Sequence, residues 1–214
     1  MRIGVAMPNM IDFPLYLITD RKQVANGLTL YTAVEEALKG GVKAVQLREK
    51  DLSAAELLQL ATQLRDLTRS HGALLFINDN IDIALAVKAD GVHLGEHSEA
   101  TEVIRAKVGE KMLIGVSTHS KEEIERAAKQ GADFVTFGPV YATPSKAKYG
   151  EPQGLNKLSE ACRNSSIPVF ALGGITPERA AEVQQAGASG IALISAIIAS
   201  SDPCLSAAAF TTCS

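Results

Sequence analysis

The hydrophobic positions of this chain fall into short apolar runs that alternate with stretches of helical periodicity. The near-continuous apolar character of the runs is typical of parallel strands buried on both faces. We expect strands at 15–20, 44–50, 73–79, 91–95, 112–118, 134–139, 168–174 and 190–195. Apolar residues three and four positions apart predict helices between them, for example over 53–70 and 120–131. Eight such units in one α/β domain predict a (β/α)8 TIM barrel, with a doubly wound open sheet as the alternative.

Capping residues mark several helix starts. Ser53 with Glu56, and Ser120 with Glu123, have the spacing of capping boxes. Thr176 precedes a proline that would open a helix. Four of the helical segments end at a glycine just before a strand, where a left-handed residue can close the helix. The recurrence of this pattern about every two strand–helix units favours an iterated architecture.

Both ends of the chain depart from the repeat. Residues 1–12 are expected to form an N-terminal extension, and residues 202–214 a short C-terminal helix of about one or two turns with a frayed tail. With these ends, residues 1–214 are expected to form a single domain. The chain is 46% hydrophobic and 21% charged, which is usual for a globular protein with a sizeable core.

Charge and cysteine content exclude several classes of protein. The net charge is −3, so the composition predicts neither a nucleic-acid nor a membrane partner. The first ten residues lack a signal-peptide pattern, and no apolar run approaches the roughly 18 residues of a membrane helix. Cys162, Cys204 and Cys213 lack the spacing of a zinc site or a disulfide framework. A cytoplasmic protein is expected, and its affinity for anions must come from a few local groups.

Polar side chains gather at the carboxyl ends of the expected strands, where the catalytic groups of a parallel barrel lie. One set combines an arginine fork with mobile lysines and hydroxyls, which suits a diphosphate. It comprises Arg48, Lys50, Ser117, Thr143, Ser145 and Lys146. The alternative for Arg48 and Lys50 is an ordinary ion pair with Glu49 or Asp51. Asp79, beside Asn78, could hold Mg²⁺, which takes one or two carboxylates together with phosphate oxygens.

A second anion site is expected at the last two strands. Gly173 and Gly174 follow the seventh strand, and Ser195 follows the eighth. Glycine lets backbone amides approach an oxygen closely, and phosphate binding at strands seven and eight recurs in barrels. The alternative is that the two glycines only form a tight turn.

The histidines differ in their expected roles. His93 alternates into a strand, so packing or hydrogen bonding inside the barrel is the favoured interpretation. His71 is placed at a helix C-terminus, where a cation interacts well with the helix dipole. His119 follows the fifth strand and is the candidate acid–base group.

Six motifs carry a resemblance that runs from residue 15 to about residue 197. In order they are QLREK, INDNIDIALAVKADGVHLG, IGVSTHS, GADFVTFGPVYATPSK, ALGGIT and AGASGIALISAI. Together they resemble the thiamine phosphate synthase family and its close relatives, the thiazole tautomerases. The resemblance implies a transferase in which a pyrimidine methyl diphosphate loses pyrophosphate and the nitrogen of a thiazole phosphate captures the resulting cation.

The resemblance also implies a role for each candidate residue. Catalytic roles fall to Ser117 and Lys146, and to His119 in the tautomerase branch. Substrate contacts fall to Gln46, Arg48, Lys50, Asn78, Thr143, Ser145, Gly173, Ile194 and Ser195. Asp79 matches a Mg²⁺ ligand. The long loop after the sixth strand would close over the diphosphate and exclude water, so Lys146→Ala is expected to lower turnover sharply.

The chain departs from the synthase pattern at two places. Ser98 occupies the position of a second acidic metal ligand, for which Glu96 or Glu99 could substitute, and the loop sequence ATPSKAKYGEPQGL is unusual. Both features favour thiazole tautomerisation, with His119 moving a proton. Lys50 and Asp79 favour the synthase, which accounts for most residues and is the leading hypothesis. A non-catalytic phosphate-binding barrel is the third.

Overall fold

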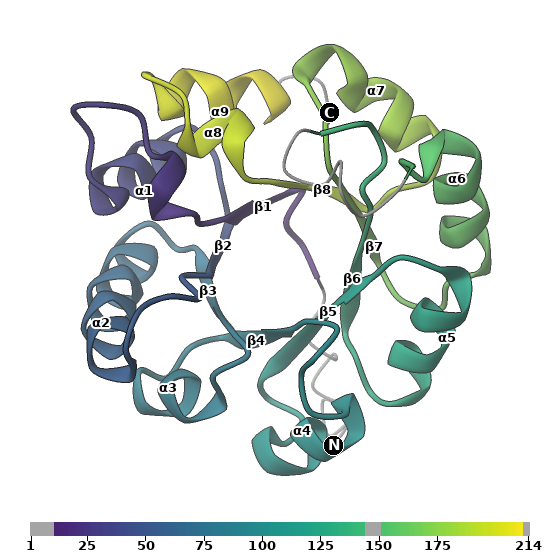
Figure 1. The fold of residues 1–214 in the computed structure, drawn as a ribbon, viewed down its shortest axis with the longest axis horizontal. Coiled ribbons are helices and arrows are strands. Elements are labelled where there is room, and N and C mark those ends of the chain that lie inside the picture. Colours follow the sequence, from purple (N-terminus) through teal and green to yellow (C-terminus); the bar gives the residue numbers. More distant parts are fainter. Residues whose placement is uncertain (1–10, 144–150, 212–214) are drawn as a thin grey trace, which may run out of the picture.

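The computed structural model describes residues 11–143 and 151–211 and shows a closed parallel barrel (Figure 1). The strands are β1 Leu15–Ile18, β2 Ala44–Leu47, β3 Leu74–Asn78, β4 Gly91–Leu94, β5 Leu113–Thr118, β6 Phe134–Phe137, β7 Val169–Leu172 and β8 Gly190–Leu193. Each strand pairs with the next, and β1 pairs with β8. The predicted TIM barrel is therefore confirmed, and the open-sheet alternative is wrong. The carboxyl ends of all the strands therefore lie at the same rim of the barrel.

The helices form a ring outside the barrel (Figure 1). They are α1 Leu30–Lys39, α2 Ala54–Ser70, α3 Ile81–Ala86, α4 Thr101–Val108, α5 Lys121–Lys129, α6 Gly154–Asn164, α7 Pro177–Gln185, α8 Ser195–Ile198 and α9 Pro203–Thr211. A short 3-10 helix, η1 Arg21–Gln23, follows β1. The C-terminal helix α9 is longer than the expected one or two turns. It packs so closely on the end of α1 that a Cβ at Gly40 would lie 2.3 Å from the Cys204 carbonyl oxygen.

The predicted helix boundaries are confirmed in part. Ser53 and Glu56 form a complete capping box. Ser120 caps α5, but the Glu123 carboxylate accepts from the His119 amide, so the second half of that box is wrong. Thr176 is the N-cap residue of α7, but its hydroxyl makes no capping hydrogen bond.

The barrel interior is filled by aromatic rings that face glycines on neighbouring strands. Ring centroids lie 5.0–6.2 Å apart in a cluster made of Phe13, Tyr16, Phe76, Phe134 and Phe170. A Cβ at Gly91 or Gly190 would lie 2.4 Å from a ring carbon of Phe76 or Phe170, respectively. Gly91 is one of the four glycines that the sequence pattern placed at a helix end, but it lies inside β4. The left-handed residue before β4 is Lys88 instead.

Two copies of one ion-pair arrangement tie the helices to the amino-terminal end of the barrel. Asp90 before β4 pairs with Arg65 of α2 and accepts from the Leu75 amide at 2.8 Å. Asp133 before β6 pairs with Arg105 of α4 at 2.5 Å, and accepts from the backbone of β5 in the same way. The arrangement recurs two strand–helix units along the chain, which agrees with the iterated architecture expected from the sequence. Among the described residues, no helix has the length and apolar character to cross a membrane.

Candidate active site

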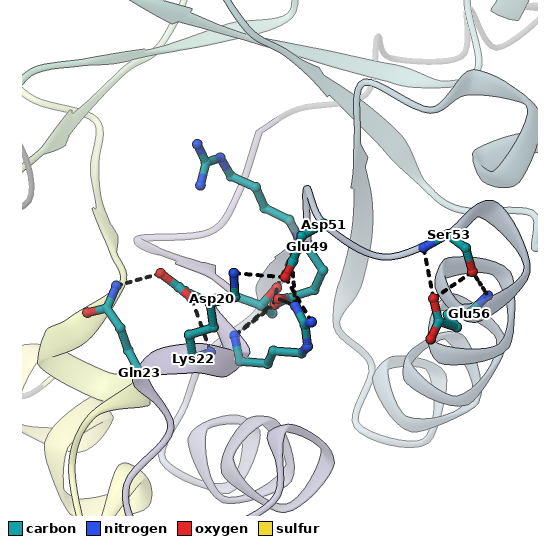
Figure 2. A network of polar contacts seen from close by, with 10 residues as sticks. Asp20, Lys22, Gln23, Glu49, Asp51, Ser53 and Glu56 are labelled. Carbon is teal, nitrogen blue, oxygen red and sulfur yellow. Dashed lines mark hydrogen bonds and ion pairs between the residues drawn. The ribbon is translucent and has the colours of Figure 1, made fainter.

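A buried carboxylate fixes the chain where it leaves β2. Glu49, only 5% exposed, accepts from the Thr19 hydroxyl at 2.7 Å and from the Arg21 amide at 3.1 Å. Asp51 lies outside this site and pairs with Arg21 at 2.5 Å and with Lys22 at 2.8 Å. Figure 2 shows Glu49 and Asp51 beside Lys22 and Asp20, so β1 and β2 are linked by this network. Arg21 holds the pKa of the Asp51 carboxyl below its usual range through a hydrogen bond.

The same network leaves two cations available to a ligand. Glu49 and Asp51 are taken by Arg21 and Lys22, and no ion pair of Arg48 or Lys50 occurs among the described residues. The alternative that Arg48 and Lys50 pair with their neighbouring acids is therefore wrong. Arg48 is half-buried and anchored through its amide, which donates to the Thr19 hydroxyl at 2.9 Å, and Lys50 is exposed.

A row of hydrogen bonds crosses the upper barrel and includes two of the predicted site residues. The Gln46 amide donates to the Tyr16 hydroxyl at 3.2 Å. That hydroxyl lies 3.2 Å from His93 Nδ1, and His93 Nε2 lies 3.1 Å from Ser117 Oγ. Burial lowers the pKa of His93 to about 3, so the imidazole is neutral at physiological pH. The interpretation of His93 as a packed, hydrogen-bonded residue is confirmed.

The period-two alternation of strands places further predicted residues above this row. Gln46, Asn78 and Ser117 each follow by two positions an interior residue of the same strand, respectively Ala44, Phe76 and Gly115. Arg48 comes two positions after Gln46. The Arg48 guanidinium and the Asp79 carboxylate both act electrostatically on His93, with Asp79 raising its pKa and Arg48 lowering it, after the larger effect of burial.

Asp79 holds a small polar cluster between β3 and β4. Its carboxylate accepts from the Asn78 amide at 2.6 Å, from the Gly95 backbone at 3.2 Å, and from the Ser98 hydroxyl. Ser98 thus contacts the single carboxylate instead of supplying a second one. Glu99 points elsewhere and pairs with Lys107 at 2.6 Å. No group of three His, Cys, Asp or Glu side chains suitable for a metal occurs in the described residues.

His119 lies at the end of β5 with a defined tautomer. Its Nδ1 is 2.5 Å from the Gly138 carbonyl oxygen, which can only accept, so Nδ1 carries the proton. In the neutral ring, Nε2 is therefore the unprotonated nitrogen and could act as a base. A cavity of about 140 Å³ lies between α4, α5 and the ends of β4 and β5. Ser98, Ser117 and His119 form part of its lining. A larger depression of about 550 Å³ lies at the opposite end of the barrel, beside Leu74 and Leu113.

The turn after β7 is shaped by two glycines. Gly173 and Gly174 have φ angles of +101° and +66°, and a Cβ on Gly173 would lie 2.7 Å from Pro139. The turn is tight, as the alternative proposed, and its Gly173 carbonyl also accepts from the Tyr141 amide at 3.0 Å. Within the described residues, however, the amides of Gly173, Gly174 and Ser195 donate no hydrogen bond. These donors could bind an anion.

The segment between β6 and α6 is described at its two ends, over residues 138–143 and 151–153. Tyr141 stacks under Arg179, whose guanidinium lies 4.4 Å from the ring centroid, and its hydroxyl donates to Glu182 at 2.5 Å. Thr143 is the last described residue of its first part. Ser145 and Lys146 lie outside the described residues.

Four residues that shape the site were not among the predicted site residues, namely Tyr16, Thr19, Arg21 and Glu49. Glu49 carries the clearest sequence signal, because in the REK triplet it must face away from Arg48 and Lys50. Its partners Thr19 and Arg21 lie 30 and 28 residues earlier, and no local pattern identifies them.

Comparison with known proteins gives a consistent result. A family model described as thiamine monophosphate synthase matches residues 15–197. The chain is 58% identical over 193 residues to a Geobacter sulfurreducens protein named as a candidate thiamine-phosphate synthase, covering 90% of each. It is 42% identical to the thiamine-phosphate synthase of Roseiflexus castenholzii, covering 92% of this chain and 88% of that one. The solved thiamine phosphate pyrophosphorylase from Pyrococcus furiosus superposes with a TM-score of 0.85 at 37% identity, over 94% of this chain and 95% of that one.

Proposed function

Because the chain belongs to the thiamine monophosphate synthase family, we propose that it joins 4-amino-2-methyl-5-pyrimidinylmethyl diphosphate to thiazole phosphate, or to its carboxylate form, and releases pyrophosphate. The observation that carries the proposal is the pair of cations, Arg48 and Lys50, whose neighbouring acids are already paired with other residues. They stand at the same rim as the polar groups of β3, β4 and β5.

The proposed reaction exchanges one bond for another. The bond between the pyrimidine methylene carbon and the diphosphate oxygen breaks, and its electron pair leaves with pyrophosphate. The lone pair of the thiazole nitrogen then forms the new carbon–nitrogen bond. Negative charge grows on the leaving oxygen in the transition state, where Arg48 and Lys50 stabilise it more than in the ground state. Gln46, Asn78 and Ser117 would orient the pyrimidine ring.

The thiazole phosphate would bind at the far side of the mouth. The amides of Gly173 and Ser195 carry no other acceptor among the described residues and suit a phosphate group. Ile194 precedes Ser195, packs against the interior aromatic cluster, and would contact the thiazole ring. Thr143 and Ser145 are expected to contact the same phosphate, whereas Lys146 is expected to contact the diphosphate. Ser145 and Lys146 lie outside the described residues. The substrates are small molecules, and the cysteine pattern favours the cytoplasm as their compartment.

The donor set around Asp79 fits Mg²⁺, provided that the substrate completes the coordination. Mg²⁺ commonly takes one or two carboxylates and fills its remaining positions with phosphate oxygens and water. Asp79 supplies one carboxylate, and the Ser98 hydroxyl lies against it as a neutral oxygen donor. When bound there, Mg²⁺ would neutralise charge on the diphosphate. Asn78 and the Gly95 amide hold the Asp79 carboxylate in position.

Thiazole tautomerisation is the second candidate, and the geometry of His119 is the observation that favours it. With Nδ1–H held by the Gly138 carbonyl, Nε2 could take a proton from the thiazole carboxylate phosphate. The names of the relatives support the synthase instead.

A two-substrate assay distinguishes the candidates. The purified chain is incubated with the pyrimidine diphosphate, thiazole phosphate and Mg²⁺, and pyrophosphate is measured. The synthase predicts stoichiometric pyrophosphate and thiamine phosphate, and a strong loss on Arg48→Met. Metal-independent proton exchange on the thiazole, abolished by His119→Ala and without pyrophosphate release, would assign the tautomerase. Binding of both ligands without either reaction would leave a non-catalytic phosphate-binding barrel.

A further inference from the structure

The buried row from Gln46 through Tyr16 and His93 ends on Ser117, which lies at the mouth. We propose that Tyr16 and His93 are positioning residues that hold the Ser117 hydroxyl as a hydrogen-bond donor toward the pyrimidine diphosphate. This inference rests on the proposed function, because it assigns the group that Ser117 presents to the substrate. It follows from the number of protons in the row and from the packing of the imidazole.

The donors and acceptors in the row fix the direction of its hydrogen bonds. The Tyr16 hydroxyl is fully buried and already accepts from the Gln46 amide, so its own proton must find an acceptor. Within the described residues, His93 Nδ1 at 3.2 Å is that acceptor. A proton on Nδ1 would place two donors face to face. The neutral ring therefore carries its proton on Nε2.

The direction continues to the end of the row. His93 Nε2–H donates to Ser117 Oγ at 3.1 Å, so the serine oxygen is the acceptor in this contact. The hydroxyl proton of Ser117 is then free to point away from His93. Ser117 is half-buried and stands two positions after the interior-facing Gly115 at the end of β5, so its hydroxyl faces the barrel mouth, where the substrate is proposed to bind. An unprotonated ring nitrogen of the pyrimidine is the acceptor that this donor fits.

Packing keeps the imidazole in one orientation. Its ring centroid lies 5.6 Å from that of Tyr16 and 5.9 Å from that of Phe134. The backbone of β5 also lies close to the ring, since a Cβ at Gly115 would lie 2.6 Å from His93 Nδ1. A buried ring packed against these neighbours cannot turn over easily, so the donor direction is built into the folded chain before substrate binds.

The first test reads the tautomer directly. Long-range ¹H–¹⁵N correlation spectra of histidine-labelled protein at pH 7.5 distinguish Nε2–H from Nδ1–H in a neutral ring. The His93 signal is assigned through its contacts with the Tyr16 and Phe134 rings. The proposal expects the Nε2–H form in the unmodified chain. An Nδ1–H form or a charged ring would overturn it, whether or not any variant folds.

The second test asks whether Tyr16 acts through Ser117. Tyr16→Phe is expected to lower kcat for pyrophosphate release about tenfold, the loss of one oriented hydrogen bond, with KM changed less than about twofold. Tyr31→Phe removes an exposed hydroxyl on α1 and is the matched control, expected to behave like the parent. In a Ser117→Ala background, Tyr16→Phe should cause no further loss.

The outcomes separate this inference from the proposed function. An equal loss from Tyr16→Phe in both backgrounds, or none in the parent, refutes the positioning role while leaving a synthase. A parent chain that folds but releases no pyrophosphate refutes the synthase. In that case the tautomer spectrum still decides whether Ser117 is presented as a donor.

Discussion

Replacing Glu49 with glutamine tests the network that sets Arg48 and Lys50 apart from their acidic neighbours. The substitution keeps the shape of the side chain and removes its charge. One amide oxygen can still accept from the Thr19 hydroxyl. The new NH2 group must then face the amide and guanidinium of Arg21, which are donors themselves, so at least one buried donor loses its acceptor.

The structure gives the size of the effect. The Glu49 side chain is 2% exposed and receives bonds at 2.7, 3.1, 3.2 and 3.3 Å. A hydrogen bond to a charged group contributes about 1.5–3 kcal/mol, and loss of roughly two of them would cost about 3–6 kcal/mol. Arg21 is 33% exposed, so water compensates part of the loss. We expect Glu49→Gln to lower the free energy of unfolding by about 3 kcal/mol.

Asp51→Asn is the matched control, because Asp51 binds the same arginine while its side chain is 44% exposed. Urea unfolding at pH 7.5, followed by circular dichroism, should show a much smaller shift of the midpoint for this variant. Glu49→Gln should also lower kcat/KM for pyrophosphate release, because Thr19 links Glu49 to the Arg48 amide. Equal midpoints for the two variants would refute the assignment of Glu49 as the residue that holds this segment.

Three further predictions concern separate parts of the chain. Ser98→Asp should place a second carboxylate beside Asp79. Repulsion between the two should destabilise the protein in EDTA, and the added ligand should lower the Mg²⁺ concentration for half-maximal activity. An unchanged Mg²⁺ dependence argues against a metal at Asp79. Gly91→Ala should cost about 1–3 kcal/mol in urea unfolding, because its Cβ would overlap the Phe76 ring, and an unchanged midpoint would contradict that packing. Burial raises the pKa of the Cys162 thiol to about 11, so iodoacetamide at pH 8 should label it far more slowly in the folded chain than in urea, as mass spectrometry would show.

The fold could be predicted because each strand is a near-continuous apolar run, but the strand ends could not be placed from hydrophobicity alone. The expected strand 44–50 ends at Leu47, because the Arg48 amide bonds to a side chain instead of the neighbouring strand. The expected strand 168–174 ends at Leu172, because Gly173 turns into the left-handed region. At both places the polar residues of the site leave the sheet.

The position of the candidate site at the barrel rim could be predicted, but the hydrogen bonds within it could not. Polar residues after each strand indicated where the chemistry gathers, and alternation indicated which of them face inward. The partners of Glu49 and the link between Tyr16 and His93 join strands 28 to 77 residues apart, so only the closed barrel brings them together. Ser98 was interpreted from the sequence as standing in the place of an acidic residue, but its bond to Asp79 could be seen only in the structure.

The two sides of the barrel mouth offer different kinds of group to the proposed substrates. On the side of β1 to β5, the described chain buries polar and charged side chains, including Thr19, Gln46, Glu49 and His93, each of which costs stability unless every partner is in place. On the side of β7 and β8, the available donors are backbone amides at Gly173 and Ser195. Conservative side-chain changes should therefore impair use of the pyrimidine diphosphate. Changes that alter the backbone, such as Gly173→Ala, should raise the KM for thiazole phosphate, because the donors at Gly173 and Ser195 are amides that keep their protons whatever side chain they carry.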